Sequence, residues 1–154
     1  MNPNSVTYIS VLKACGIVKS LETGGFIDAE IRKRGLFKKD IVLGNALMDM
    51  YCKCGALDKP NEVFEKLLVR DVVSWNVLII GYVQHRLGDE ALKCFKQMKD
   101  ESVYPNVVTY IGVLRACGIM KICRGRGRYR RGNQKASVIT ERHCDWQHID
   151  GHVF

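Results

Sequence analysis

One segment of this chain occurs twice in nearly identical form, and this internal repeat constrains the fold more than any other feature. Residues 3–19 read PNSVTYISVLKACGIVK and residues 105–121 read PNVVTYIGVLRACGIMK, with 13 of 17 positions identical at an offset of 102. Two segments between them, IVLGNALMDMY at 41–51 and VVSWNVLIIGY at 72–82, follow the same pattern. Internal repetition of this kind predicts a chain built from stacked copies of one supersecondary unit.

Alignment of these segments divides the chain into repeat units. The units cover residues 5–40, 41–71 and 72–106, with lengths of 36, 31 and 35 residues. A fourth unit begins at residue 107, and we expect only the first helix of a truncated repeat over 107–121. Residues 122–154 form a basic tail in which the repeat pattern is lost.

Each unit is expected to fold into two helices. The first carries apolar or small residues at helical spacing, as in Trp75, Leu78 and Ile79, which places them on one helical face. A break containing glycine follows, and an aspartate then offers an N-cap for the second helix. The expected N-caps of these second helices are Asp58 and Asp89.

A helical hairpin of roughly 33 residues cannot bury its own apolar face, whereas stacked hairpins bury it against one another. The sequence therefore predicts an all-α fold, an α-solenoid of stacked helix–turn–helix repeats. We interpret the aromatic and methionine side chains of the stripes as solenoid core rather than as ligands of a cofactor.

Charge and composition narrow the range of functions. The net charge is +8, but residues 1–120 hold 16 Lys+Arg against 13 Asp+Glu, and residues 121–154 hold 8 against 3. Overall basicity is therefore weak support for nucleic-acid binding by the repeats. No apolar run approaches the roughly 18–20 residues of a membrane span, and we expect no membrane association. No secretory signal or transit peptide is visible at the N-terminus, and the seven cysteines lack paired spacing, which predicts reduced thiols.

The tail allows two interpretations. One is an arginine-rich arm that binds RNA electrostatically. The other follows from residues 142–154, whose possible codons, shifted by one base, can encode DIVIGNTLMDMF. That string nearly reproduces DIVLGNALMDMY at 40–51, again at an offset of 102. We therefore interpret 122–154 as frame-shifted repeat-coding sequence that is disordered.

The sequence carries no recognised catalytic signature. A zinc-dependent deaminase needs His-x-Glu with a later Cys-x-x-Cys, and neither is present. Cys144, His148 and His152 have helical spacing, but a fourth ligand is not evident. We expect no metal, no cofactor and no enzymatic activity.

The units resemble pentatricopeptide repeats. The resemblance rests on VTYIxVLxACG, on NALMDMYCKCGALD at 45–58, on DVVSWNVLIIGY at 71–82 and on the closing VYPN that ends at Asn106, and it covers about residues 3–121. The alternation of 36, 31 and 35 residues is similar to the long, short and standard repeats of the plant subclass. The resemblance implies a right-handed superhelix, location in a mitochondrion or chloroplast, and a chain that is a fragment of a longer array.

The resemblance also implies a function, which is sequence-selective binding of single-stranded RNA with one nucleotide per repeat. The family's biological settings are organellar transcript processing and C-to-U RNA editing, with any deaminase or editing cofactor acting in trans. Base choice is attributed to the fifth and last residues of a repeat, base stacking to the second, and a phosphate contact to a lysine. The corresponding residues here are Asn45 with Asp71, Asn76 with Asn106, Val42 and Val73 for stacking, and Lys53 for phosphate.

The chemistry of these pairs predicts pyrimidine selection. The Asp carboxylate only accepts hydrogen bonds, which suits the N3–H of uracil, whereas an Asn amide can donate to the N3 of cytosine. Asn45 with Asp71 should therefore prefer U, and Asn76 with Asn106 a pyrimidine, with C favoured. In the first unit the Ile9 side chain cannot form a hydrogen bond, so Asp40 lacks a partner for base selection. We expect this unit to act as a spacer or to pack against its neighbours rather than to contact a base.

Other interpretations stay open. Asp40 and Asp71 could be turn residues or helix caps, and an Asn one turn into a helix is often only solvated. The same concave surface could serve as a protein–protein scaffold, and the chain could be a non-functional gene fragment. The repeated pairing of a fifth-position Asn with a closing Asp or Asn favours RNA, because a scaffold does not need it.

Overall fold

The computed structural model describes the backbone of residues 3–129 and the side chains of residues 3–122. The chain divides into two compact units, Met1–Ile122 and Cys123–Phe154, and the fold below is that of the first. Within the described part there are seven α-helices and no strand, which confirms the predicted all-α class. Over the same residues no helix is both long enough and apolar enough to cross a membrane.

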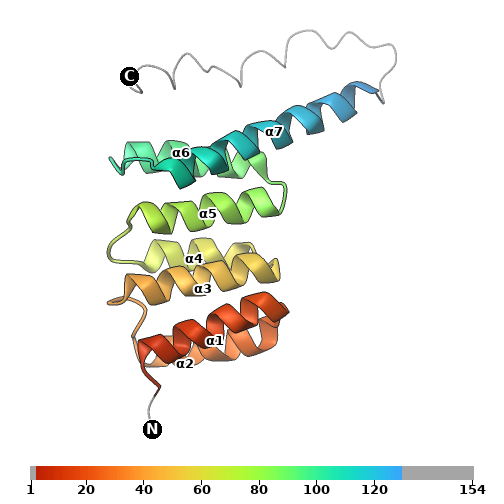
Figure 1. Ribbon diagram of the computed structural model, residues 1–154. Helices are drawn as coiled ribbons and strands as arrows, with labels where there is room; N and C mark the ends of the chain where they lie inside the picture. Colours follow the sequence, from red (N-terminus) through yellow and green to blue (C-terminus); the bar gives the residue numbers. More distant parts are fainter. Residues whose placement is uncertain (1–2, 130–154) are drawn as a thin grey trace. The chain divides into compact units, whose positions relative to one another are not determined.

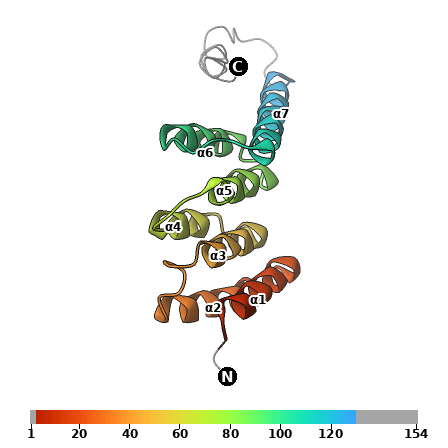
Figure 2. The same ribbon diagram turned by 60° about the vertical axis from the view of Figure 1, so that its left-hand side comes forward.

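The helices alternate between two layers (Figures 1 and 2). In what we call the first layer, α1, α3 and α5 lie side by side and the first turns of α7 follow; α2, α4 and α6 form the second layer. This is the stacking of helical hairpins that defines an α-solenoid. The helices are α1 (Ser5–Val18), α2 (Leu21–Lys33), α3 (Ile41–Cys54), α4 (Asp58–Lys66), α5 (Val72–Gln84), α6 (Gly88–Asp100) and α7 (Val107–Tyr129).

Each first-layer helix starts directly after an Asn or Asp whose side-chain oxygen accepts a backbone N–H of the first turn. Asp71, for example, accepts the N–H of Ser74 at 2.9 Å. Such a cap satisfies a backbone donor that has no partner inside the helix, so these residues determine where each helix begins. The four caps are Asn4, Asp40, Asp71 and Asn106.

The expected caps of the second-layer helices are wrong. α4 begins at Asp58 itself, with Leu57 in the cap position, and α6 begins before Asp89, with Leu87 in the cap position. Neither helix has a hydrogen bond from its cap side chain. Both aspartates instead lie in the first helical turn, where a carboxylate interacts favourably with the positive end of the helix dipole.

Helix α7 extends beyond its expected end. The repeat pattern stops at Lys121, but the helix continues to Tyr129 (Figure 1). The segment after Lys121 contains no proline and several arginines, which have good helix propensity, so loss of the repeat pattern does not itself end the helix. The remainder of the expected tail, including residues 142–154, whose codons suggested a frame shift, and Cys144, His148 and His152, lies outside the described residues.

The core lies between and within the two layers. Phe64 of α4 packs edge-on against Trp75 of α5, with ring centroids 4.5 Å apart, and Trp75 is almost wholly buried. Gly81 lets α5 approach α3, because a Cβ there would overlap the sulfur of Cys52. The aromatic stripe residue Trp75 is therefore core, as predicted. Fully buried apolar side chains in both layers include Leu12, Ile31, Leu47, Met48, Val63, Ile79 and Met98.

Candidate nucleic-acid interface

A cavity of about 260 Å³ opens between α3, α5 and the start of α7. Val73 and Asn76 of α5 line it together with Asn106, the cap of α7, and all three are residues that the sequence analysis selected. Val108, from the first turn of α7, lines it as well. The structure therefore brings together Asn76 and Asn106, the pair predicted to select a base in the third unit, with the exposed valines Val73 of α5 and Val108 of α7.

A chain of hydrogen bonds fixes the orientation of the Asn76 amide. The backbone N–H of Thr109 donates to Asn106 Oδ1 at 3.1 Å, which identifies that atom as an oxygen. Asn76 Nδ2 donates to the same oxygen at 3.0 Å, and the Thr109 hydroxyl donates to Asn76 Oδ1 at 2.6 Å. A flipped Asn76 amide would place two acceptor oxygens against each other, so the backbone N–H determines the whole arrangement.

The hydrogen atoms left over after these bonds determine what the pair can offer a ligand. Both side-chain oxygens, Asn76 Oδ1 and Asn106 Oδ1, already accept hydrogen bonds. One Nδ2–H of Asn76 and both of Asn106 have no partner among the described residues. The Asn76–Asn106 pair therefore presents donors, and it suits a ligand edge made of acceptors.

The corresponding pair of the second unit is not joined. Asn45 is 8% exposed and Asn76 5%, so burial does not distinguish them, but Asn45 does not line the cavity and its Oδ1 is buried without a hydrogen-bond partner in the described part of the chain. Asp71 Oδ1 accepts from both the N–H and the hydroxyl of Ser74. Asp71 is thus a helix cap, an interpretation that the sequence had left open, and its Oδ2 stays unpartnered among the described residues.

The first unit lacks a polar pair altogether. Asp40 caps α3 by accepting the N–H groups of Val42 and Leu43, both at 3.1 Å. Ile9, the fifth residue of that unit, is half-buried and apolar. The contacts of Asp40 are those of a cap, with no fifth-position amide beside it.

Exposed valines follow each cap. Val42, Val73 and Val108 occupy equivalent places in the first turns of α3, α5 and α7, and each keeps about half of its surface exposed. Val108 was missed by the sequence analysis, although it is the second residue of the unit that begins at residue 107. Counting positions in the fourth unit as in the second and third would have found it.

Lys53 is not a free cation. Its ammonium lies 2.6 Å from the carboxylate of Asp49, one helical turn earlier on α3, and Asp49 itself lines the cavity. A phosphate at Lys53 would have to compete with Asp49 or share the ammonium with it. The proposed phosphate contact therefore starts from a paired lysine.

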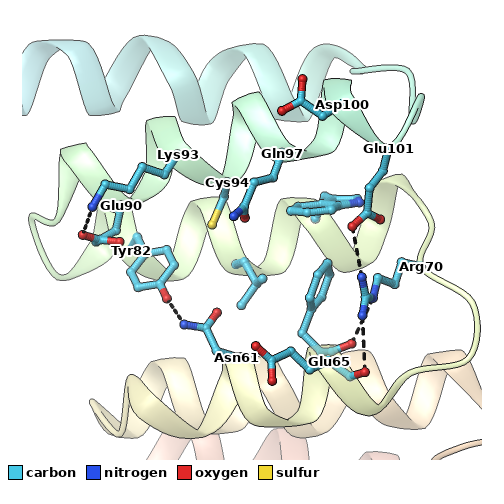
Figure 3. Close-up of a pocket in the computed structure, with 13 residues that line it drawn as sticks. Asn61, Glu65, Arg70, Tyr82, Glu90, Lys93, Cys94, Gln97, Asp100 and Glu101 are labelled. Carbon is cyan, nitrogen blue, oxygen red and sulfur yellow. Dashed lines mark hydrogen bonds and ion pairs between the residues drawn. The ribbon is translucent and has the colours of Figure 1, made fainter. Parts of the chain in front are cut away.

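A second cavity, of about 420 Å³, lies between α4, α5 and α6 (Figure 3). Arg70 spans one side of it, donating to the backbone oxygens of Phe64 and Glu65 and pairing with Glu101 at 3.0 Å. Four carboxylates face only two cations there, a balance that repels a polyanion. The first cavity is lined by one charged residue, Asp49, and we assign the candidate interface to it because it holds the Asn76–Asn106 pair and two exposed valines. The charged residues lining the second are Glu65, Glu90, Asp100 and Glu101, with Arg70 and Lys93.

Two of the buried cysteines, Cys52 and Cys94, have thiols that are unreactive near neutral pH. Burial raises the pKa of the Cys52 thiol to about 12 and that of Cys94 to about 11, so both stay protonated near neutral pH. Thiolates, not thiols, are nucleophiles and metal ligands. Among the described residues no group of three or more histidine, cysteine or acidic side chains is placed to hold a metal ion.

The stacked helical hairpins place this chain in the class of helical repeat proteins. The Asn76–Asn106 pair at the first-layer cavity is its candidate binding feature. Two models of the pentatricopeptide repeat match this chain, one over residues 45–72 and one over residues 70–118. The chain belongs to the pentatricopeptide repeat family.

Relatives from Arabidopsis thaliana agree with this assignment. A pentatricopeptide repeat-containing protein named as mitochondrial is 42% identical over 115 residues, which are 75% of this chain and 15% of the relative. Another, named as chloroplastic, is 38% identical over 117 residues, or 76% of this chain and 13% of the relative. The chain thus spans only about a seventh of these proteins, whose names describe repeat proteins rather than enzymes.

Solved structures share the fold. The pentatricopeptide repeat protein PPR10 in complex with an 18-nt psaJ RNA element matches 87% of this chain with a TM-score of 0.67 and 23% identity, over 21% of that protein. PPR10 from maize matches 84% with a TM-score of 0.63 and 20% identity, over 19% of that protein. At these identities the likeness establishes the α-solenoid and no more.

Proposed function

We propose that this chain binds single-stranded RNA and selects pyrimidines along its first layer. The observation that carries the proposal is the Asn76–Asn106 pair, which lines a cavity with unpartnered amide donors between the exposed valines Val73 and Val108. Aromatic bases taken out of a stack need an apolar surface and a polar edge contact, and this cavity offers both. A structural relative, PPR10, is described in complex with RNA.

The third unit is proposed to read cytosine. Cytosine presents two adjacent acceptors, N3 and O2, whereas uracil presents a donor at N3. The amide hydrogens of Asn76 and Asn106 that have no partner among the described residues match N3 and O2 of cytosine and oppose the N3–H of uracil.

The second unit is proposed to read uracil. Asp71 Oδ1 accepts the hydrogen bonds that cap α5, and Asp71 Oδ2 has no donor among the described residues. Oδ2 can therefore accept the N3–H of uracil. Asn45 Oδ1 is buried and has no hydrogen-bond partner among the described residues, and a buried acceptor without a partner is costly. Val42 and Val73 would hold the base between them, and Lys53 would contact phosphate in competition with Asp49.

The biological setting follows from the family. We propose organellar transcript processing or C-to-U RNA editing, in a mitochondrion or a chloroplast, with any deaminase or editing cofactor acting in trans. The names of the relatives, one mitochondrial and one chloroplastic, support the location. The division into long, short and standard repeats over 5–40, 41–71 and 72–106 is part of the same proposal.

The test is a matched pair of cap substitutions. Asp71→Asn should lower the U-to-C affinity ratio at one base position roughly tenfold, because the free acceptor becomes a donor. Asp40→Asn is the control, since both residues cap a helix through Oδ1 and Asn caps as well as Asp. The measurement is fluorescence anisotropy of the full chain with oligoadenylates carrying UC, UU, CC or CU.

A change of preference with Asp71→Asn alone supports the proposal. Equal effects of the two substitutions would show that only the cap matters and would remove Asp71 from base selection. Absence of binding to any of the RNAs by the unmodified chain would refute RNA binding by this segment.

A further inference from the structure

The Thr109 side chain occupies an unusual place between three polar groups. It is wholly buried, and its hydroxyl oxygen accepts the backbone N–H of Asn106 at 3.1 Å. The same hydroxyl lies within donating distance of two oxygens, Asn76 Oδ1 at 2.6 Å and Asn106 Oδ1 at 3.1 Å, of which Asn76 Oδ1 is the nearer. Its own backbone N–H donates to Asn106 Oδ1 at 3.1 Å. One residue thus caps α7 reciprocally with Asn106 and at the same time fixes the amide of the preceding unit.

We propose that Thr109 is a positioning residue that sets base choice in the third unit by holding Asn76 Oδ1. This inference rests on the proposed function. With Oδ1 held by the hydroxyl, the Asn76 amide keeps its orientation, and its remaining Nδ2–H stays available to a ligand beside the Asn106 amide. Without the hydroxyl, Asn76 Oδ1 would be a buried acceptor that lacks a partner, and the amide would turn toward any donor it can reach. The N3–H of uracil is such a donor.

The sequence pattern agrees with a link between this hydroxyl and the amide. Thr109 is the third residue of the unit that follows Asn76, and Ser74 is the third residue of the unit that follows Asn45. Where the fifth residue is apolar, as in Ile9, the third residue of the next unit is Leu43. In sequence a hydroxyl thus accompanies an amide, but only Thr109 contacts its amide, because the Ser74 hydroxyl donates to Asp71 Oδ1 and Asn45 Oδ1 has no partner among the described residues.

A purely capping role explains less of the geometry. Asn106 Oδ1 already accepts the Thr109 N–H, which is sufficient for a cap. Leu43 holds the equivalent place in α3, and Asp40 caps that helix without any hydroxyl. The short hydroxyl contact to Asn76 is therefore additional to what helix initiation requires.

The test compares Thr109→Val, which keeps the shape and loses the hydroxyl, with Thr109→Ser, which keeps the hydroxyl. Binding of the full chain to oligoadenylates carrying UC, UU, CC or CU gives the C-to-U affinity ratio at the base position that Asp71→Asn does not affect. We expect Thr109→Val to lower that ratio roughly threefold to tenfold and Thr109→Ser to preserve it. The preference at the position affected by Asp71→Asn should stay unchanged in both variants.

A second measurement needs no RNA. In side-chain amide spectra of the full chain, Thr109→Val should move the Asn76 Nδ2 resonances and leave those of Asn45 in place, with Thr109→Ser close to the unmodified protein. An unchanged C-to-U ratio in a folded Thr109→Val variant overturns the proposal. If the unmodified chain binds no RNA, the proposed function fails. In that case the amide spectra still test whether Thr109 holds the Asn76 amide. Asn76 resonances that do not move in Thr109→Val would show that it does not.

Discussion

At the scale of single residues, a backbone N–H decides the polarity of the candidate site. The N–H of Thr109 can only donate, so the atom of Asn106 that it contacts must be an oxygen, and the Asn76 amide is oriented in turn. The repeat positions that the family resemblance singles out predicted that Asn76 and Asn106 would lie together, as they do at the cavity. They could not predict that the oxygens would be consumed, because hydrogen bonds between units depend on how closely two helices pack.

Other residue-scale features were beyond the sequence for the same reason. The hydroxyl of Tyr51 donates to buried Asp28 at 2.7 Å across 23 residues, and Arg32 pairs with that carboxylate from the next helical turn. The pKa of Tyr51 is raised, chiefly by burial and then by this hydrogen bond. By contrast, Lys53 and Asp49 are four residues apart on one helix, so their pairing could have been read from the sequence.

Gly88 offers a residue-scale prediction about stability. A Cβ at this position would lie 2.8 Å from the backbone oxygen of Ala116, which cannot move aside as a flexible side chain can. Gly88→Ala should therefore lower the free energy of unfolding by about 1–3 kcal/mol. Gly25→Ala is the matched control, because a Cβ there meets nothing within 4 Å, and Ala should stabilise α2 by about 0.5–1 kcal/mol. Urea denaturation measures both, and a Gly88→Ala variant as stable as Gly25→Ala would contradict the close packing of α6 on α7.

At the scale of elements, helix existence and stacking were predictable and some helix ends were not. The caps Asp71 and Asn106 precede strong apolar stripes, so α5 and α7 begin at the expected residues. Asp58 and Asp89 fell inside their helices because the preceding leucines take the cap positions without a side-chain bond. Stripe periodicity fixes which face is buried, but it says little about the last or first turn.

Glu62 links two second-layer helices and gives a pH-dependent prediction. Its pKa is lowered to about 2, first by the hydrogen bond from Lys66 on α4 and then by the charge of Arg32 on α2. Because the folded pKa is below the ordinary value of 4.5, ionised Glu62 stabilises the fold above pH 4.5, and this contribution is lost as the pH falls toward 2.

Glu62→Gln should therefore flatten the fall of Tm between pH 4.5 and 2 and leave the profile near neutral pH parallel to that of the unmodified chain. Glu22→Gln serves as the control, since Glu22 forms no ion pair within the described residues. Thermal unfolding followed by circular dichroism at each pH gives the profiles. Identical acid-limb slopes for Glu62→Gln and the unmodified chain would show that the Arg32–Glu62 contact between α2 and α4 does not persist in solution.

At the scale of the repeat array, one layer carries the candidate interface and the other a charge balance unsuited to it. The first-layer cavity holds valines and amide donors, and the second cavity is lined by four carboxylates and two cations. The net charge of the whole chain does not reveal this difference, because much of it lies beyond residue 120. Which charged and polar side chains line each cavity depends on how the helices stack, so this difference could not be predicted from the sequence.

The central claim is that RNA lies along the first layer, and mapping of backbone amide shifts tests it most directly. On titration of the full chain with an oligoadenylate carrying UC, we expect the largest shifts at Val73, Asn76, Asn106 and Val108, and small ones at Glu90 and Glu101. Addition of an oligoadenylate without pyrimidines should produce weaker shifts at the same places. Shifts centred on the second cavity, between α4, α5 and α6, would contradict RNA binding along the first layer. Equal shifts with both RNAs would contradict pyrimidine selection at the Asn76–Asn106 pair.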